Sequence, residues 1–328
     1  MNKDGFREFL RGRQLSEDKI DRAIPMVEKF AAFLSASDRP TTPEQARNED
    51  VHAFSQVLIK EKLNTFDNFV ALARYGRFVN NNTLYVAVIE LLDGSEALEN
   101  LHKKLGDEIG DKKRDRIFEG LDLPPLGTPS TEKPRLTQTV LDRMERAVDS
   151  ETCKRILGSG LRTLPDEGYL AAKKTFLQAG SLDAYLKRKG DDFIAELERI
   201  RDENGLFFTQ PITDEVIDFV QTHPEIRQGI REGSVLYEAK IPYMTVKYLA
   251  ETDEAMKQYY YCHCPWVRES LRTGEAGVPP TFCNCSAAFH KKPYEVIFDR
   301  PLEAEVIESV LNGDPWCRFA IHLPENAV

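Results

Sequence analysis

The chain has 328 residues, of which 41% are hydrophobic and 30% are charged, and its formal net charge is −10. This length and composition predict a folded protein of two domains and exclude a disordered or fibrous chain. The negative charge argues against a protein that coats nucleic acid or anionic membranes. No run approaches the roughly 18 apolar residues of a membrane span, and residues 1–10 lack the apolar core of a secretion signal. We therefore expect a cytoplasmic protein with no membrane partner.

Helical patterns fill the first 120 residues. Apolar residues recur every three or four positions from Glu17 to Ser35 and predict one helix, in which Pro25 favours a bend. Similar patterns predict further helices, over 48–58, 64–78, 84–92 and 95–105.

The stretch LSEDKIDRAIPMVEKFAAFL and the helices from Asn48 to Leu92 resemble the helical core-binding domain of phage-type integrases. That resemblance implies contact with DNA. Residues 1–120, however, contain 19 Lys and Arg against 21 Asp and Glu, a balance of −2, whereas a DNA clamp is expected to be basic. A docking or dimerisation module is therefore the preferred interpretation, and DNA binding is the alternative.

A proline-rich segment marks the predicted domain boundary. The letters LDLPPLGTPSTEKPR hold four prolines, which end helices and favour an extended chain. The sequence therefore predicts a helical domain over 1–120, a linker over 121–136 and a cysteine-rich α/β domain over 137–328.

Strand patterns appear late in the chain. Ser234–Ile241 alternates polar and apolar residues, and the aromatic-rich Gln258–Cys264 also favours an extended chain. Leu302–Leu311 and Cys317–Leu323 predict a hairpin joined at Asn312-Gly313-Asp314. The predicted fold class is α+β, with an all-helical domain followed by an α/β ligand-binding-type domain that has an antiparallel sheet.

Two Cys-x-Cys pairs, Cys262/Cys264 and Cys283/Cys285, suggest a metal site. In a strand, residues i and i+2 face the same side, so two such pairs can build a cage of four sulfurs. Four thiolates suit zinc, and an iron–sulfur cluster is the alternative cofactor. A redox dithiol and a set of reduced, packed thiols are the other interpretations.

Several side chains near the cysteines suit a small anionic or aromatic ligand. For each of them a core or solvated role is the competing interpretation. These candidate ligand-binding residues are Tyr243, Lys247, Tyr261, Trp266, Arg268 and Lys291. Glu269 and His290 are the candidate catalytic residues, on condition that a bound metal keeps an open position.

The closing segment EAEVIESVLNGDPWCRFAIHLP resembles the end of the 4-vinyl reductase domain family and of L-2-amino-thiazoline-4-carboxylic acid hydrolase-like proteins. The motifs CHCPWVRES and FCNCSAAFHKKP resemble a cysteine-rich prokaryotic group related to both. The resemblance implies an α/β fold with a ligand pocket, often a dimer, and metal binding by the cysteines. It transfers no catalytic residue.

Three functions follow from these patterns. The first is a cytoplasmic metal-binding protein that binds a small organic ligand as a sensor or accessory factor, with a homodimer as the implied assembly. The second is a metal-assisted hydrolase of a small carbon–nitrogen or thiazoline-type substrate, in which Cys283 or Cys285 is the nucleophile or a ligand. The third is a DNA-associated regulator that responds to a ligand.

Overall fold

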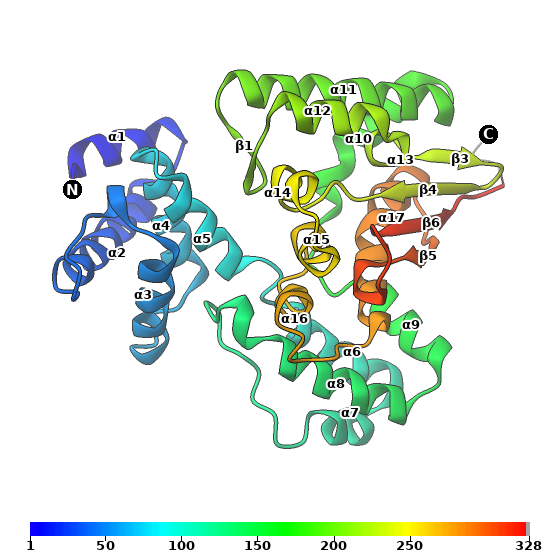
Figure 1. Cartoon of the computed structure of the whole chain (residues 1–328), viewed down its shortest axis with the longest axis horizontal. Coiled ribbons are helices and arrows are strands. Elements are labelled where there is room, and N and C mark those ends of the chain that lie inside the picture. Colours follow the sequence, from blue (N-terminus) through cyan, green and yellow to red (C-terminus); the bar gives the residue numbers. More distant parts are fainter. Residues whose placement is uncertain (326–328) are drawn as a thin grey trace. The chain divides into compact units, whose positions relative to one another are not determined.

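The computed structural model of the chain describes residues 1–325 and divides into two compact units (Figure 1). The N-terminal unit combines Met1–Ser95 with Leu123–Lys133, and the C-terminal unit combines Glu96–Asp122 with the chain from Pro134 onward. The helices of 96–122, which the sequence placed in the first domain, thus belong to the second unit. Within residues 1–325, no helix is both long and apolar enough to cross a bilayer.

The N-terminal unit is entirely helical. Its first helix begins at an asparagine cap, where the Asn2 side chain accepts a hydrogen bond from the Gly5 amide. The predicted helix over Glu17–Ser35 is confirmed, and Pro25 lies within it. The α-helices are α1 (Lys3–Gly12), α2 (Glu17–Ser35), α3 (Asn48–Lys60), α4 (Phe66–Phe78) and α5 (Asn82–Leu92), with short 3-10 turns at Pro43–Gln45 and Ser130–Glu132.

The proline-rich segment packs on this unit. The Ser55 hydroxyl donates to the carbonyl oxygen of Gly127 at 2.6 Å, and the Asn64 amide donates to that of Leu126 at 3.0 Å. Gly127 has a φ of +94°, and a Cβ built there would lie 2.4 Å from Cζ of Phe69. The segment therefore has a fixed place against α3 and α4, which only glycine allows at residue 127.

The C-terminal unit mixes helices and strands. Its helices are α6 (Ala97–Ile109), α7 (Asp111–Phe118), α8 (Pro134–Ala147), α9 (Ser150–Gly158), α10 (Leu170–Ala179), α11 (Leu182–Asp202), α12 (Asp214–Thr222), α13 (Pro224–Arg227), α14 (Thr245–Ala250), α15 (Glu254–Tyr261), α16 (Arg268–Thr273) and α17 (Asn284–Phe298). Short 3-10 turns lie at Asp166–Tyr169, Pro280–Cys283 and Val310–Asn312.

Two antiparallel sheets complete this unit. The smaller pairs β1 (Leu206–Phe207) with β2 (Gln210–Pro211), and the larger has the strand order β3-β4-β6-β5. Its strands are β3 (Ile230–Glu232), β4 (Val235–Ala239), β5 (Glu303–Glu308) and β6 (Arg318–His322). The predicted antiparallel pairing of β5 with β6 is confirmed, with a bulge between Val306 and Glu308. The first strand ends earlier than predicted, because Val310–Asn312 form a 3-10 turn. The fold class is therefore α+β.

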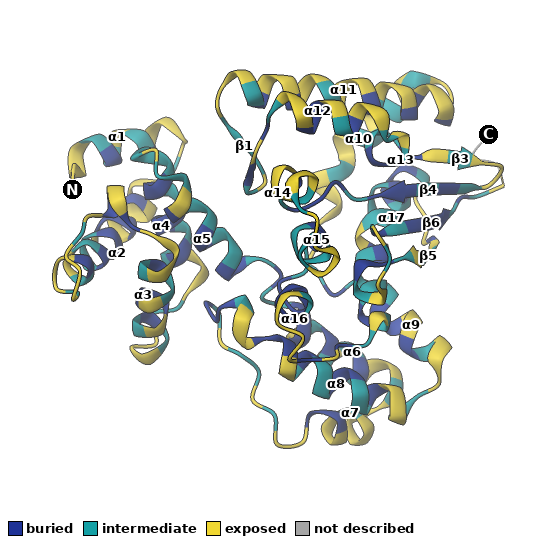
Figure 2. Ribbon diagram, in the orientation of Figure 1, coloured by how far each residue is buried: buried dark blue, intermediate teal, exposed yellow. Residues whose placement is uncertain are grey.

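One face of the larger sheet packs against α17 and α11. Leu236 of β4 and Ile321 of β6 share a buried cluster with Tyr294 of α17 and Leu186 of α11. Figure 2 shows β4 buried along most of its length, whereas much of the surface of α11 is exposed. Strand β4 and α17 therefore belong to the buried interior of this unit.

One strand prediction is wrong. The aromatic-rich segment before Cys262 is helical in the structure, because α15 runs from Glu254 to Tyr261. The Asp253 carboxylate caps it by accepting a hydrogen bond from the Met256 amide at 2.9 Å. Local capping thus outweighs the strand propensity of the tyrosines.

Candidate functional site

The candidate site lies at one end of the larger sheet. Strands β4 and β5 both run antiparallel to β6, so the residues that follow β4 and β5 lie beside the residue that precedes β6. Lys240 follows β4, Ser309 follows β5 and Cys317 precedes β6. The Lys240 amide donates to the carbonyl oxygen of Cys317 at 3.2 Å. The strand ends therefore bring an ammonium, a hydroxyl and a thiol together.

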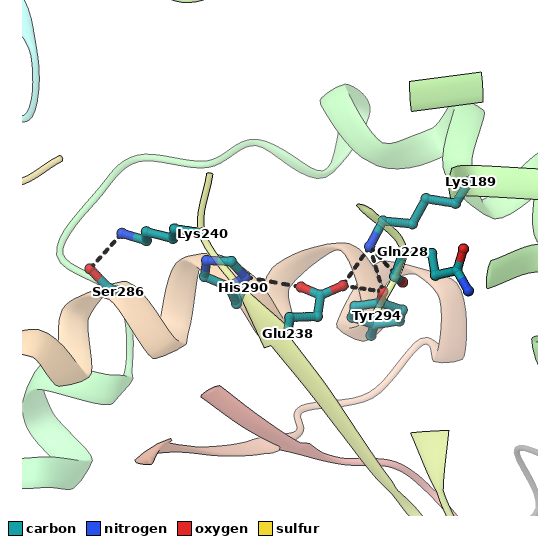
Figure 3. Close-up of polar contacts among 7 residues, drawn as sticks. All are labelled: Lys189, Gln228, Glu238, Lys240, Ser286, His290 and Tyr294. Atoms are coloured by element: carbon teal, nitrogen blue, oxygen red, sulfur yellow. Dashed lines mark hydrogen bonds and ion pairs between the residues drawn. The ribbon is translucent and has the colours of Figure 1, made fainter. Parts of the chain in front are cut away.

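Helix α17 supplies a polar stripe on its sheet-facing side. Ser286, His290 and Tyr294 recur every four residues, and Cys283 comes three residues before Ser286, so the four lie along one side of the helix. Ser286 accepts a hydrogen bond from Lys240 Nζ at 3.0 Å. Figure 3 shows Ser286, His290 and Tyr294 along the helix, close to Lys240 and to Glu238 of β4. Tyr294 is buried and Ser286 and His290 are half-buried, so their polar groups need partners, which Glu238 of β4 and Lys240 provide.

Four thiols line one cavity at this sheet end, namely those of Cys262, Cys264, Cys283 and Cys317. The cavity is small, with a volume of about 20 Å³, which is room for about one water molecule. Its other walls are formed by Lys240, His263, Ser286, Val306, Glu308, Ser309, Val310 and Phe319. The thiols come from three separate stretches of the chain, so the fold itself gathers them.

The first Cys-x-Cys pair is held by the histidine between its cysteines. Nε2 of His263 lies 2.7 Å from the carbonyl oxygen of Ile241, and since a carbonyl only accepts, Nε2 carries the hydrogen. Burial lowers the pKa of His263 to about 3, so its imidazole is neutral. This bond fixes the turn after α15, which presents Cys262 and Cys264 to the same cavity.

The second Cys-x-Cys pair is divided. Cys283 ends the 3-10 turn before α17, and Cys285 lies within α17. In a helix, residues i and i+2 point in directions about 200° apart around the axis, so the two thiols face different sides. Cys285 does not line the cavity, and its thiol contacts the backbone of Leu161 instead. The alternation of a strand, on which the prediction of Cys285 as a ligand rested, does not apply here. Cys317 takes its place at the cavity.

Burial raises the pKa of three cavity thiols, those of Cys262, Cys283 and Cys317, so these three are protonated near pH 7. Burial raises the pKa of Cys283 to about 12, and burial also raises the pKa of Cys262 well above its usual range. None of the six cysteines, all of which lie within residues 1–325, forms a disulfide. Within residues 1–325, no three side chains of His, Cys, Asp or Glu are grouped closely enough to share one metal ion. Four cysteines therefore line the cavity without forming a grouped set of metal ligands in this structure.

A buried charged network adjoins the cavity (Figure 3). Glu238 of β4 is only 6% exposed, and its carboxylate accepts hydrogen bonds from Tyr294 at 2.6 Å and from Lys189 of α11 at 2.5 Å. His290 Nδ1 lies 2.9 Å from the second carboxylate oxygen. The His290 ring stacks on Phe319 at 4.4 Å between centroids, and Phe319 lines the cavity. The network and the cavity therefore share a wall.

The charges in this network follow from its contacts. Burial alone would raise the pKa of Glu238, but the Lys189 ammonium and the His290 hydrogen bond outweigh it and lower the pKa to about 2. Burial lowers the pKa of His290 despite the carboxylate. Glu238 is thus ionised and His290 is neutral near pH 7. Because a carboxylate only accepts, Nδ1 of His290 carries the hydrogen and Nε2 is the acceptor.

The predicted ligand-binding residues do not line this cavity. Each holds a structural contact. The Tyr261 hydroxyl donates to the Lys240 carbonyl, the Trp266 carbonyl accepts from Thr137, and Lys291 Nζ donates to the Leu302 carbonyl. Lys247 is exposed and lies over the Tyr260 ring, while the buried Arg268 stacks on Tyr243 at 4.4 Å.

The two candidate catalytic residues lie in different places. Glu269 of α16 is buried, accepts a hydrogen bond from Tyr259 and pairs with Arg272 at 2.8 Å. It does not line the cavity, and its contacts are those of a structural ion pair. His290 lies in the network beside the cavity, oriented by Glu238. Of the two, only His290 is placed next to the thiols' cavity.

Sequence reasoning missed six residues of this region: Lys189, Glu238, Lys240, Ser286, Tyr294 and Cys317. Two of them had a readable signal. Glu238 and Lys240 follow Leu236 at intervals of two, so they share the face of β4 that carries a buried leucine. Charged residues on a buried strand face point to partners elsewhere in the chain.

Comparisons of the chain with protein-family models, with curated proteins and with solved structures find no match.

Proposed function

We propose that the C-terminal unit binds a metal cofactor through Cys262, Cys264, Cys283 and Cys317. The observation that carries the proposal is the single cavity lined by four thiols from three stretches of the chain. Thiolates are ligands that zinc and iron–sulfur clusters favour, and metal binding deprotonates them. Relative to the sequence prediction, Cys317 replaces Cys285 as the fourth ligand.

Other roles for these thiols have less support. A nucleophilic or redox-active cysteine needs a lowered pKa and access to its partner. Burial instead raises the pKa of Cys283 to about 12. A plain apolar core would not gather Lys240, Ser286 and Ser309 around the same thiols. The proposal includes a reducing compartment such as the cytoplasm, where free thiols persist.

The remaining sequence predictions stay predictions. The side chains predicted to bind a small organic ligand hold structural contacts away from the cavity. The hydrolase hypothesis places Glu269 or His290 beside an open metal position, with Cys283 or Cys285 as nucleophile or ligand. Glu269 is instead paired with Arg272. No contact described above favours a homodimer or DNA binding.

The test is metal analysis of the full chain purified without oxygen, with three cysteine variants. We expect the parent protein to retain bound metal, and Cys317→Ser and Cys264→Ser to lose it. Cys285→Ser is the matched control, because it removes a neighbouring thiol outside the cavity, and it should retain the metal. Circular dichroism and tryptophan fluorescence establish that each variant is folded.

Two results would overturn the proposal. One is a folded parent protein that binds no metal even after incubation with zinc, or with iron and sulfide. The other is a Cys285→Ser variant that loses metal while folded Cys317→Ser retains it, since that would restore the ligand set of the two Cys-x-Cys pairs.

A further inference from the structure

Lys240 carries a positive charge that no carboxylate balances. It is half-buried, and among residues 1–325 its ammonium forms no ion pair. The ammonium donates one hydrogen bond, to the neutral Ser286 hydroxyl at 3.0 Å. The carboxylate of Glu238, two residues earlier, is already paired with the Lys189 ammonium at 2.5 Å. An ammonium that is partly withdrawn from water in this way favours an anion beside it.

The end of β4 and the helix α17 face each other through two polar contacts. Ser286 and His290 lie four residues apart, on one side of the helix. Glu238 and Lys240 lie two residues apart at the end of the strand, on one face. Lys240 bonds Ser286. One turn further along the helix, Glu238 accepts a hydrogen bond from Nδ1 of His290 at 2.9 Å. The imidazole of His290 therefore lies next to the contact between Lys240 and Ser286.

The second nitrogen of His290, Nε2, is directed toward Lys240. Figure 3 shows it on the Lys240 side of the ring, away from Glu238. The ring stacks on Phe319 at 4.4 Å between centroids, and Lys240 Nζ lies 5.7 Å from the centroid of the same phenyl ring. No group in the described part of the chain donates a hydrogen bond to Nε2. In a neutral imidazole this nitrogen is an acceptor, so it can accept a hydrogen bond from a ligand.

From these positions we infer that Lys240, Ser286 and His290 form a binding site for a small oxyanion that also carries a hydroxyl group. The oxyanion accepts hydrogen bonds from the Lys240 ammonium and the Ser286 hydroxyl, and the hydroxyl of the ligand donates to Nε2 of His290. Small 2-hydroxy carboxylates and hydrogen phosphate share this pair of groups. The site uses none of the cysteine thiols, so the inference goes beyond the proposed metal binding and does not depend on it.

The contacts behind the histidine determine its role in this site. Lys189 and Tyr294 donate hydrogen bonds to Glu238 at 2.5 and 2.6 Å and keep its carboxylate ionised. An ionised carboxylate beside Nδ1 of His290 holds the hydrogen on that nitrogen and leaves Nε2 as the acceptor. Burial lowers the pKa of His290, and the charge of Lys240 lowers it further, so the ring is neutral near pH 7.

A ligand from solvent can reach the three side chains. Lys240 and Ser286 are half-buried, and the side chain of His290 is 14% exposed. Partial burial strengthens a charge-assisted hydrogen bond, because water competes with it less than at an open surface. The three groups thus combine access with the polar contacts that orient a small ligand.

Lys291 of the same helix shows the contrast with a structural lysine. Its ammonium donates to the Leu302 carbonyl at 2.7 Å and pairs with the Glu295 carboxylate at 3.2 Å. It thus has a counter-charge and a fixed acceptor within the chain. Lys240 has the hydroxyl of Ser286 alone, which leaves its charge to an external anion.

The experiment titrates the full chain, labelled with 15N in its histidines, with glycolate, and follows the ring nitrogens by NMR. The signals of His290 are identified by their loss in His290→Gln. We expect glycolate to shift Nε2 of His290. Acetate, which lacks the hydroxyl, should bind about tenfold more weakly, because one hydrogen bond is lost. Inorganic phosphate is the second probe, and the tighter of the two oxyanions identifies the class as carboxylate or phosphate.

Two lysine variants test the cation. Lys240→Met should weaken binding of glycolate and phosphate about tenfold or more, because a hydrogen bond to a charged group is lost. Lys291→Met is the matched control and should bind them like the parent protein. Circular dichroism establishes that each variant is folded, and Ser286→Ala, which should also weaken binding, tests the same site if Lys240→Met does not fold.

Three results would overturn the inference. The first is that neither glycolate nor phosphate shifts the signals of His290 at millimolar concentration. The second is equal affinity in Lys240→Met, Lys291→Met and the parent protein, or an unchanged affinity in Ser286→Ala where Lys240→Met is unfolded. The third is equal binding of glycolate and acetate, which would remove Nε2 of His290 from the site.

Discussion

Replacing Glu238 by glutamine tests the buried network most directly. The carboxylate accepts hydrogen bonds from Lys189, Tyr294 and His290, and the side chain is only 8% exposed to solvent. Glutamine keeps the size of the side chain but removes its charge and turns one acceptor into a donor. The variant therefore leaves the Lys189 ammonium without its counter-charge and places an amide hydrogen opposite a hydrogen-bond donor.

The expected loss in the free energy of unfolding is about 3 kcal/mol. Breaking one partner of a buried ion pair costs roughly 3–5 kcal/mol. The Lys189 side chain is 34% exposed and can turn toward water, which favours the lower end of that range. The pKa of Glu238 leads to the same figure, because its fall from 4.5 to about 2 corresponds to about 3 kcal/mol of stability near pH 7.

The assay is urea unfolding at pH 7, monitored by tryptophan fluorescence. The chain has two tryptophans, Trp266 and Trp316, and both lie in the C-terminal unit, so the signal reports that unit alone. The control is Glu305→Gln, which removes an exposed carboxylate that contacts His322 at 2.6 Å and should cost less than about 1 kcal/mol. A loss of under about 1 kcal/mol in Glu238→Gln, or equal losses in both variants, would refute the reasoning.

Three further outcomes follow from the same contacts. The stability difference between the parent and Glu238→Gln should narrow as the pH falls from about 4.5 toward 2, because the lowered pKa stabilises the fold only while Glu238 is ionised; a pH-independent difference in urea unfolding would contradict this. Tyr294→Phe removes a donor to the Glu238 carboxylate and should cost about 1–3 kcal/mol in the same assay, and a cost near zero would argue against that hydrogen bond. Gly127→Ala should increase hydrogen exchange in α3 and α4, because its Cβ would overlap Ser55 and Phe69; Gly12→Ala, where a Cβ meets nothing within 4 Å, should leave exchange unchanged, and similar exchange in both variants would contradict the packing.

Periodicity and turn chemistry predicted much of the fold. Glu17–Ser35 was predicted as one helix from apolar residues spaced by three and four, and those residues are the buried face of α2. The hairpin of β5 and β6 followed from alternation around Gly313, which has a φ of +92°. Such signals are local. The aromatic residues of 258–264 favoured a strand, whereas the structure has α15 there, which begins after the Asp253 cap.

The buried network had no such local signal. Glu238 and its partner His290 are 52 residues apart, and Lys189 lies 49 residues before Glu238. Alternation shows which face of β4 carries Glu238, but only the packing of α17 and α11 on that face determines its partners. Sequence reasoning could therefore flag the charged residues of the strand without assigning their contacts.

The cysteines show most clearly how local conformation decides a site. The same motif, Cys-x-Cys, occurs twice, and its outcome depends on the backbone between the two thiols. In the turn after α15, held by His263, both thiols of Cys262 and Cys264 reach the cavity. At the start of α17 the helical rotation directs Cys285 away from Cys283. The fourth cysteine that lines the cavity is Cys317, because the antiparallel register of β4, β5 and β6 brings it there. No spacing rule in the sequence connects it to either pair.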